Sequence, residues 1–154
     1  RMAAYTDSLG FYKGTAAFGA HSYKRQGYVE GILDFAKIVA ACAAASATAL
    51  AAADTLQVLQ LPANAVILHA GMEVIEAEVT NTTATFDLGF TGGSPEAANF
   101  FVNDGASNAL AVLQTKMANA VVVGSSNDTI DLLLNTAAPT NCVIRVFAFL
   151  LDPN

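Results

Sequence analysis

Three glutamates that lie close together, Glu73, Glu76 and Glu78, come nearest in type and spacing to a catalytic arrangement. Paired carboxylates perform the acid–base steps of glycoside hydrolysis. In a strand, however, only Glu76 and Glu78 would share a face, because successive side chains alternate between the two faces. No aromatic platform for a sugar accompanies them in the sequence. We therefore interpret these glutamates as a solvated strand face, and we predict that the protein is not an enzyme.

Histidine and cysteine, which could bind a metal or attack a substrate, are few and widely separated. Neither His21 nor His69 has a His, Asp or Glu partner at metal-ligand spacing. Cys42 and Cys142 occur without a CxxC motif, so we expect two buried thiols rather than a zinc site or a disulfide framework. The sequence thus predicts no catalytic residue, no metal site and no cofactor.

The distribution of tyrosine points instead to binding. All four tyrosines lie within the first 28 residues, among glycines and most of the positive charge. This segment has neither helical nor strand periodicity, so we predict an extended, irregular N-terminal arm over residues 1–28, anchored on a partner by its aromatic and basic side chains. The alternative is an arm folded back on its own body. The predicted partner-binding residues are Tyr5, Phe11, Tyr12, Lys13, Phe18, Tyr23, Lys24, Arg25 and Tyr28.

The remainder of the chain is acidic and poor in charge. Residues 54–154 contain ten acids and two cations, whereas residues 1–53 contain three acids and five cations. Nucleic-acid binding requires clustered Lys and Arg, so we expect no direct nucleic-acid partner. The apolar stretch 38–53 is mostly alanine and too short to cross a bilayer, so we expect no membrane partner. Only 13% of the residues are charged, about half the usual fraction, which indicates buried subunit contacts.

From residue 29 onward, apolar and polar side chains alternate in short runs. This alternation predicts an all-β body over residues 29–154. We expect strands at 29–38, 56–61, 66–68, 72–80, 84–89, 120–123, 129–134 and 142–151, with a break or bulge at Gly71. About eight strands without alternating helices favour an antiparallel β-sandwich, jelly-roll-like in its connections.

Some parts of this body are predicted in more detail. The strands at 72–80 and 84–89 form a hairpin in which Phe86 and Leu88 face inward, and the last strand is covered on both faces because it is almost continuously apolar. Residues 40–53 fit either a helix or a linker, since alanine favours helix. Residues 94–119 form a long excursion with a short helix over 96–101.

Segments 33–37 (LDFAK), 53–58 (ADTLQV), 61–66 (LPANAV), 74–79 (VIEAEV) and 85–90 (TFDLGF) follow one another along this body. Through these motifs, residues 29–151 resemble the capsid decoration (cement) proteins and related virion proteins of tailed bacteriophages. The resemblance implies a β-sandwich that assembles as a homotrimer and attaches to the outside of an icosahedral shell. It names no catalytic residue, and it does not extend to the arm.

The resulting hypothesis is a structural virion protein on the outer surface of the capsid, with major capsid protein subunits and its own copies as partners. The arm would lie across neighbouring subunits, and many copies would add modest contacts into strong stabilisation of the shell. The alternative is a tail, baseplate or fibre subunit with a receptor- or glycan-binding head. This alternative predicts an exposed aromatic site or a metal site within residues 90–119.

Overall fold

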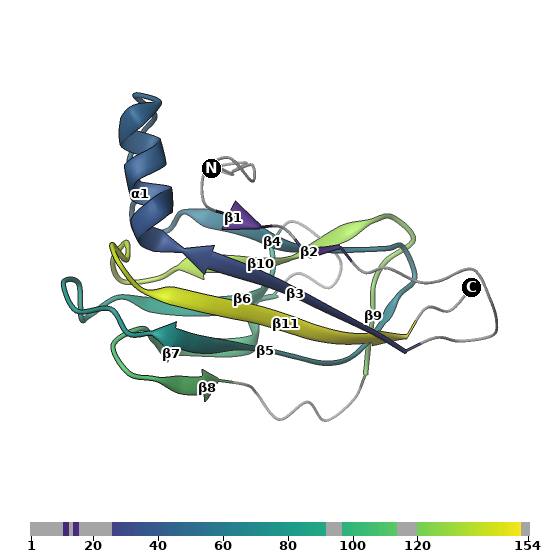
Figure 1. Ribbon diagram of the computed structural model, residues 1–154. Coiled ribbons are helices and arrows are strands. Elements are labelled where there is room, and N and C mark those ends of the chain that lie inside the picture. The colour runs from purple at the N-terminus through teal and green to yellow at the C-terminus, as the bar shows by residue number, and fades with distance from the viewer. Residues whose placement is uncertain (1–10, 13, 16–25, 92–96, 114–119, 152–154) are drawn as a thin grey trace.

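The computed structural model describes residues 11–12, 14–15, 26–91, 97–113 and 120–151, and these form two β-sheets packed face to face. The sandwich is all-β apart from one helix at one end, which projects beyond the sheets (Figure 1). The predicted antiparallel β-sandwich is confirmed. Among the described residues, one short pair of strands is parallel, β2 (Gly14–Thr15) with β4 (Thr55–Leu61).

The first sheet, called here the β3–β11–β5 sheet, has its longest strands at its centre. Its strands in spatial order are β1 (Phe11–Tyr12), β3 (Gln26–Asp34), β11 (Val143–Leu151), β5 (Val66–Glu76) and β8 (Ala111–Leu113), and β9 (Val121–Val122) also pairs with β5. The second sheet, called the β4–β10–β6 sheet, has the order β2, β4, β10 (Asp128–Leu134), β6 (Thr85–Phe90) and β7 (Ala97–Ala106).

The core lies between the two sheets and follows from the period of two. In β10, Ile130, Leu132 and Leu134 are buried, and in β6 the predicted inward residues Phe86 and Leu88 are buried as well. A fully buried side chain of this size contributes about 2 kcal/mol to folding. Burial of one face of each strand therefore holds the two sheets together.

Helix α1 (Phe35–Ala44) settles the alternative left open for residues 40–53: a short helix ends at Ala44 and an irregular segment follows it. The helix begins within the predicted strand 29–38, because the Asp34 carboxylate accepts a hydrogen bond from the Lys37 backbone N–H at 3.1 Å and caps the first turn. Phe35, Ile38 and Cys42 bury one face of the helix.

The predicted hairpin of strands 72–80 and 84–89 is wrong. Strands β5 and β6 belong to different sheets, and the chain between them crosses from one sheet to the other. The predicted break at Gly71 is also wrong, since Gly71 pairs with Phe147 inside a continuous strand. Turn residues between two strands show that the chain reverses but do not show which strand it pairs with next.

Two further predictions fail for reasons of pairing. The helix expected over 96–101 is strand from Ala97 onward, because Ala97 and Val102 pair with Phe90 and Leu88 of β6. Residue 96 itself lies outside the described residues. Strand β11 is not covered on both faces: its even-numbered residues are buried, whereas Phe149 is 45% exposed. Its apolar run instead reflects a central position between β3 and β5.

Candidate functional site

The outer face of the β3–β11–β5 sheet carries most of the exposed large hydrophobic side chains of the described residues. Alternation turns Val29 and Leu33 into the core and leaves Tyr28 and Ile32 outside. The exposed members are Tyr28, Ile32, Ile75, Val112, Val122 and Phe149. Exposed large apolar side chains gathered on one face of a sheet in this way favour an interaction site. We call this surface the open face.

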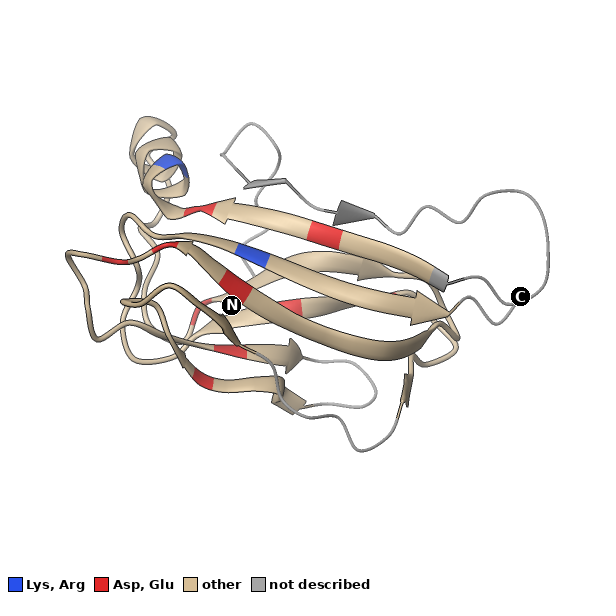
Figure 2. Ribbon diagram, turned by 60° about the horizontal axis from the view of Figure 1, so that its bottom comes forward, with Lys and Arg blue, Asp and Glu red and all other residues tan. Residues whose placement is uncertain are grey.

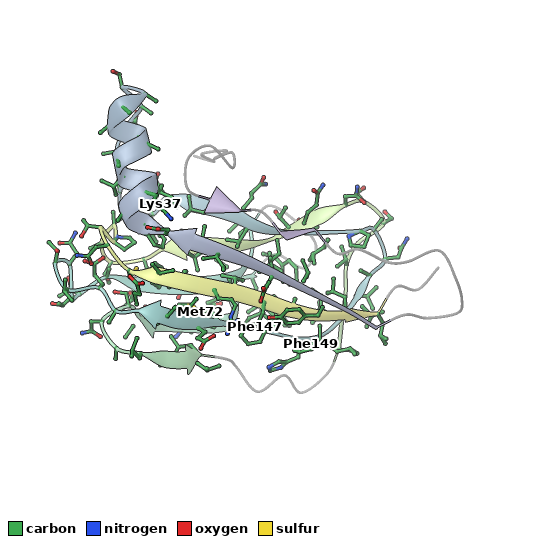
Figure 3. All side chains as sticks on the ribbon, in the orientation of Figure 1. Lys37, Met72, Phe147 and Phe149 are labelled. Carbon is green, nitrogen blue, oxygen red and sulfur yellow. The ribbon has the colours of Figure 1, made fainter. Side chains whose placement is uncertain are left out.

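Aromatic side chains form one end of the open face. The ring centroids of Tyr28 and Phe149 lie 5.1 Å apart, and His69 lies 6.5 Å from Phe149 and 6.1 Å from Phe147. Figure 3 labels Phe147 and Phe149 near one another on β11. The Tyr28 hydroxyl donates a hydrogen bond to Glu30 Oε2 at 2.7 Å. Burial is the main cause that raises the pKa of Tyr28, and the nearby Glu30 carboxylate raises it further. This cross-strand cluster offers rigid rings that lose little entropy when a partner covers them.

A charged group lies beside the aromatic cluster. Arg145 Nε donates to Glu73 Oε2 at 3.0 Å, Nη2 contacts the same oxygen, and Nη1 lies 3.7 Å from Glu30 Oε2. In Figure 2 the blue band on β11 lies between red bands on the two neighbouring strands. The hydrogen bond from Arg145 to Glu73 raises the pKa of the guanidinium further. Because this cation is already paired, the open face presents apolar area with a small net negative charge.

The predicted arm residues are only partly described. Tyr5, Lys13, Phe18, Tyr23, Lys24 and Arg25 lie outside the described residues. Phe11 and Tyr12 form β1, which pairs with Leu33 and Ile32 of β3. Tyr28 lies within β3, on the open face, and β3 begins at Gln26, so the last three residues assigned to the arm belong to the sheet.

Sequence reasoning missed Phe147, Phe149 and Arg145. A signal existed: Arg145 interrupts an apolar run at a position that alternates with the buried Ile144 and Val146. A charged residue at that position indicates a strand with one face toward the core and one face toward solvent.

The three glutamates considered for catalysis are held in separate environments. Glu73 pairs with Arg145, Glu76 is exposed, and Glu78 is buried. No two of them form an acid–base pair around a common space. Among the residues that the structure describes, no cluster of His, Cys, Asp and Glu could hold a metal ion, and no helix is long and apolar enough to span a membrane.

Glu78 joins two loops at the end of the sandwich. Its carboxylate accepts hydrogen bonds from the backbone N–H groups of Thr80 (3.0 Å), Asn81 (3.1 Å), Thr140 (2.6 Å) and Asn141 (3.0 Å), and from the Thr140 hydroxyl (2.9 Å). Burial acts to raise its pKa, but the four backbone donors outweigh it and lower the pKa to about 2. Glu78 is therefore an ionised structural anchor.

A pocket of about 280 Å³ lies beside α1, near the loop that Glu78 holds. Its lining is mostly apolar, from Val39, Cys42, Leu50 and Pro139, with Asn81 and Thr140 as polar members. Cys42 and Cys142 are both buried and free, as predicted, and burial raises the pKa of Cys142 to about 12. Cys142 therefore does not act as a nucleophile, because a thiol with so high a pKa stays protonated at neutral pH.

Comparison with known proteins gives matches in structure but not in sequence. No family model matches the chain, and no curated protein matches it. The fold matches a chain of "Acidic stable capsid structure of Helicobacter pylori bacteriophage KHP30", with a TM-score of 0.54 and 17% identity over 88% of this chain and 92% of that chain.

Two further phage capsids contain a similar chain. The match to "Cyanophage Pam1 capsid asymmetric unit" has a TM-score of 0.58 and 18% identity over 89% of this chain and 92% of that chain. The match to "Capsid of Ralstonia phage GP4" has a TM-score of 0.58 and 17% identity over 84% of this chain and 86% of that chain. The chain therefore has a β-sandwich fold found in bacteriophage capsid structures, in line with the resemblance predicted from its sequence.

Proposed function

We propose that this protein is a non-enzymatic structural protein of a bacteriophage virion, a capsid decoration (cement) protein. It binds the outside of the major capsid shell as a homotrimer and stabilises the shell. The observation that carries the proposal is the fold shared, over most of each chain, with chains of three bacteriophage capsids. Fold alone does not define function, so the proposal also depends on the surface of this chain.

The open face supports a role in assembly. Its exposed rings, Tyr28 and Phe149, lie next to Arg145, a residue type enriched with aromatics at the centre of protein interfaces. The described residues contain only two cations, Arg145 and Lys37, and both are paired with acids of the same chain. Such a surface suits contact with protein rather than with nucleic acid.

The arm has the second role in this proposal. Residues 1–10 contain Tyr5 and Arg1, and the basic, aromatic character of residues 1–25 suits an acidic neighbouring surface. Tyr5, Phe18, Tyr23, Lys24 and Arg25 act as its anchors on adjacent capsid or decoration subunits.

The receptor- or glycan-binding alternative has less support. It predicted an exposed aromatic site or a metal site within residues 90–119. The aromatic residues of that range, Phe90, Phe100 and Phe101, pack against one another with centroids 5.1–5.9 Å apart. Two of these rings are buried and that of Phe100 is half-buried, so they offer no exposed platform for a sugar.

The test is reconstitution with shells assembled from the major capsid protein of the same phage. The purified full chain should elute with the mass of a trimer by light scattering, co-sediment with the shells and add ordered density to their outer surface in electron microscopy. A variant lacking residues 1–10 keeps every described strand, so it should remain a trimer and bind the shells at least tenfold more weakly. A full chain that fails to bind, or that binds inside the shell, overturns the proposal.

A further inference from the structure

Residues 11–15 contact an exposed edge of each sheet. Strand β1 is antiparallel to β3, with Phe11 opposite Leu33 and Tyr12 opposite Ile32. Three residues later, β2 is parallel to β4, with Gly14 opposite Leu59 and Thr15 opposite Gln60. Figure 1 shows β1 and β2 along the same side of the sandwich, where the edges of the two sheets lie close together. The two short strands β1 and β2 therefore extend one edge of each sheet along this side.

The edges that receive this segment are much longer than the segment itself. On its inner side, β3 pairs with β11 at all nine positions, whereas on its outer side β1 covers only Ile32 and Leu33. Likewise β4 pairs with β10 along its length and with β2 only at Leu59 and Gln60. Among the described residues, most of both edges thus presents main-chain donors and acceptors without a ladder partner. Such edges are templates for a strand from another chain.

The segment is also attached by a connection that permits exchange. Ten residues, 16–25, separate Thr15 from the start of β3 at Gln26. Fully extended, ten residues span up to about 35 Å, which is similar to the length of β3 itself, so the same segment can reach a neighbouring molecule. Contacts made within one chain can then be made between two chains without any new interface, as in domain swapping.

We propose that residues 11–15 are exchanged between copies, so that β1 and β2 of one molecule complete the β3 and β4 edges of the next. Opposite charge attracts the arm to a body, that of its own chain or that of a neighbour: residues 1–25 contain four cations and one acid, whereas residues 54–154 contain ten acids and two cations. This inference deepens the proposed function, because it names the contact that ties the copies of the homotrimer to one another.

Disulfide trapping between two differently tagged variants, each with one added cysteine beside the buried Cys42 and Cys142, tests the exchange. Directly opposite residues of an antiparallel pair have Cβ atoms about 5 Å apart, close enough for a disulfide after a small adjustment. Tyr12→Cys in one chain and Ile32→Cys in the other can link only between molecules. The matched control replaces Ile32→Cys with Val79→Cys, an exposed position outside the open face that does not belong to the β3 edge.

The mixture is oxidised at the concentration at which light scattering shows the assembled form. Exchange predicts a mixed-tag dimer from the Tyr12→Cys and Ile32→Cys pair, at least tenfold more abundant than from the control pair. Wild-type protein should form no link, because its two cysteines are buried. Equal linking in the two pairs, or no linking in either, overturns the exchange.

The double variant Tyr12→Cys/Ile32→Cys provides the complementary measurement. Exchange predicts covalent multimers on non-reducing gels, whereas pairing within one chain gives only a linked monomer and overturns the inference. Capsid binding by reduced wild-type protein is scored separately. If the protein binds shells but forms no mixed-tag dimers, the exchange is overturned and the proposed capsid function stands. If mixed-tag dimers form but the protein does not bind shells, the capsid function is overturned and the exchange stands.

Discussion

The outer faces of the two sheets differ in whether their side chains are buried within the chain or exposed. On the β4–β10–β6 sheet the outward side chains include Asp131, Thr129 and Asp87, yet all three are buried. Thr129 Oγ1 and the Thr91 backbone N–H donate to Asp131 at 2.6 and 3.2 Å, and the Asp104 backbone N–H donates to Asp87 at 2.7 Å. On the open face of the β3–β11–β5 sheet, by contrast, apolar side chains such as Tyr28, Ile32 and Phe149 are exposed.

The difference indicates which face needs a partner. Polar groups can be buried only when hydrogen bonds replace those made with water, and within the described residues no buried side-chain polar atom lacks such a bond. The β4–β10–β6 face is therefore completed, at least around Asp131 and Asp87, by contacts within the chain. Aromatic and aliphatic groups on the open face gain free energy only when another surface covers them.

The largest effect on the stability of the isolated chain is expected where β6 and β7 of the β4–β10–β6 sheet lie closest together. A Cβ at Gly89 would lie 2.0 Å from the carbonyl oxygen of Ala97 and 2.7 Å from the carbonyl carbon of Ala98. The backbone must shift to admit it, so Gly89→Ala should lower the free energy of unfolding by about 3 kcal/mol, measured by urea titration.

Gly105→Ala is the matched control for Gly89→Ala. Its Cβ would meet the ends of the Val102 and Leu113 side chains at 2.8 and 2.9 Å, and these can rotate away. We expect a loss of about 1 kcal/mol. Equal losses in the two variants would show that the strand β7 does not seal the β4–β10–β6 face as tightly as its contact with Gly89 implies.

Glu78→Gln should have the next largest effect, with a characteristic pH dependence. The pKa of Glu78 falls from 4.5 to about 2 on folding, so its ionised form contributes roughly 3 kcal/mol above pH 4.5, and this contribution is lost as the pH falls toward 2. The Glu78→Gln variant should therefore be less stable at pH 7 by about 2–3 kcal/mol and should lose less stability between pH 4.5 and 2. Urea titrations at a series of pH values measure both quantities.

The control for this variant is Glu76→Gln, at an exposed position two residues earlier. It should change the free energy of unfolding by less than about 0.5 kcal/mol at either pH. If the free energy of unfolding of the two variants depends on pH in the same way from acidic to neutral pH, Glu78 does not hold the loops through its charge.

Asp131→Asn should show the opposite pH dependence with a smaller amplitude. Burial raises the pKa of Asp131 above its usual 3.8, although Thr129 and Thr91 act to lower it. A carboxyl of this kind stabilises the fold most below pH 3.8, and this contribution is lost as the pH rises through its folded value. In urea titrations, the wild type should lose more stability than the variant over that rise. A steeper loss in the variant would contradict the raised pKa.

These contrasts also show how far the sequence could predict the fold. Alternation correctly predicts the sandwich and the inward Phe86 and Leu88, because periodicity directly reports burial. It does not predict that β5 and β6 enter different sheets, because that depends on the partners in the ladders, and Glu78 binds a loop that is 62 residues away at Thr140. Pairing over such separations is decided by tertiary structure and leaves little local signal.

The candidate site was predictable only in part. The arm is predicted from composition and stays a prediction; of its predicted residues, Tyr28 lies on the open face. Phe149 and the half-buried Phe147, both on β11, also contribute to that surface, although in the sequence they look like core residues. Hydrophobicity predicts that a residue will be covered but not whether its own chain or another one covers it.

The smallest effect on the stability of the isolated chain, and the largest on assembly, is expected for Phe149→Ala. Its ring is 45% exposed and loses mainly the contact with Tyr28, so the free energy of unfolding should fall by about 1 kcal/mol or less. Subunit association or capsid binding should nevertheless weaken at least tenfold, because an aromatic anchor is removed from an interface. Val79→Ala, at a 74% exposed position outside the open face, should leave both quantities unchanged. If Phe149→Ala and Val79→Ala behave alike in sedimentation and shell binding, the open face is ordinary surface, and the contrast between the two sheet faces has no part in assembly.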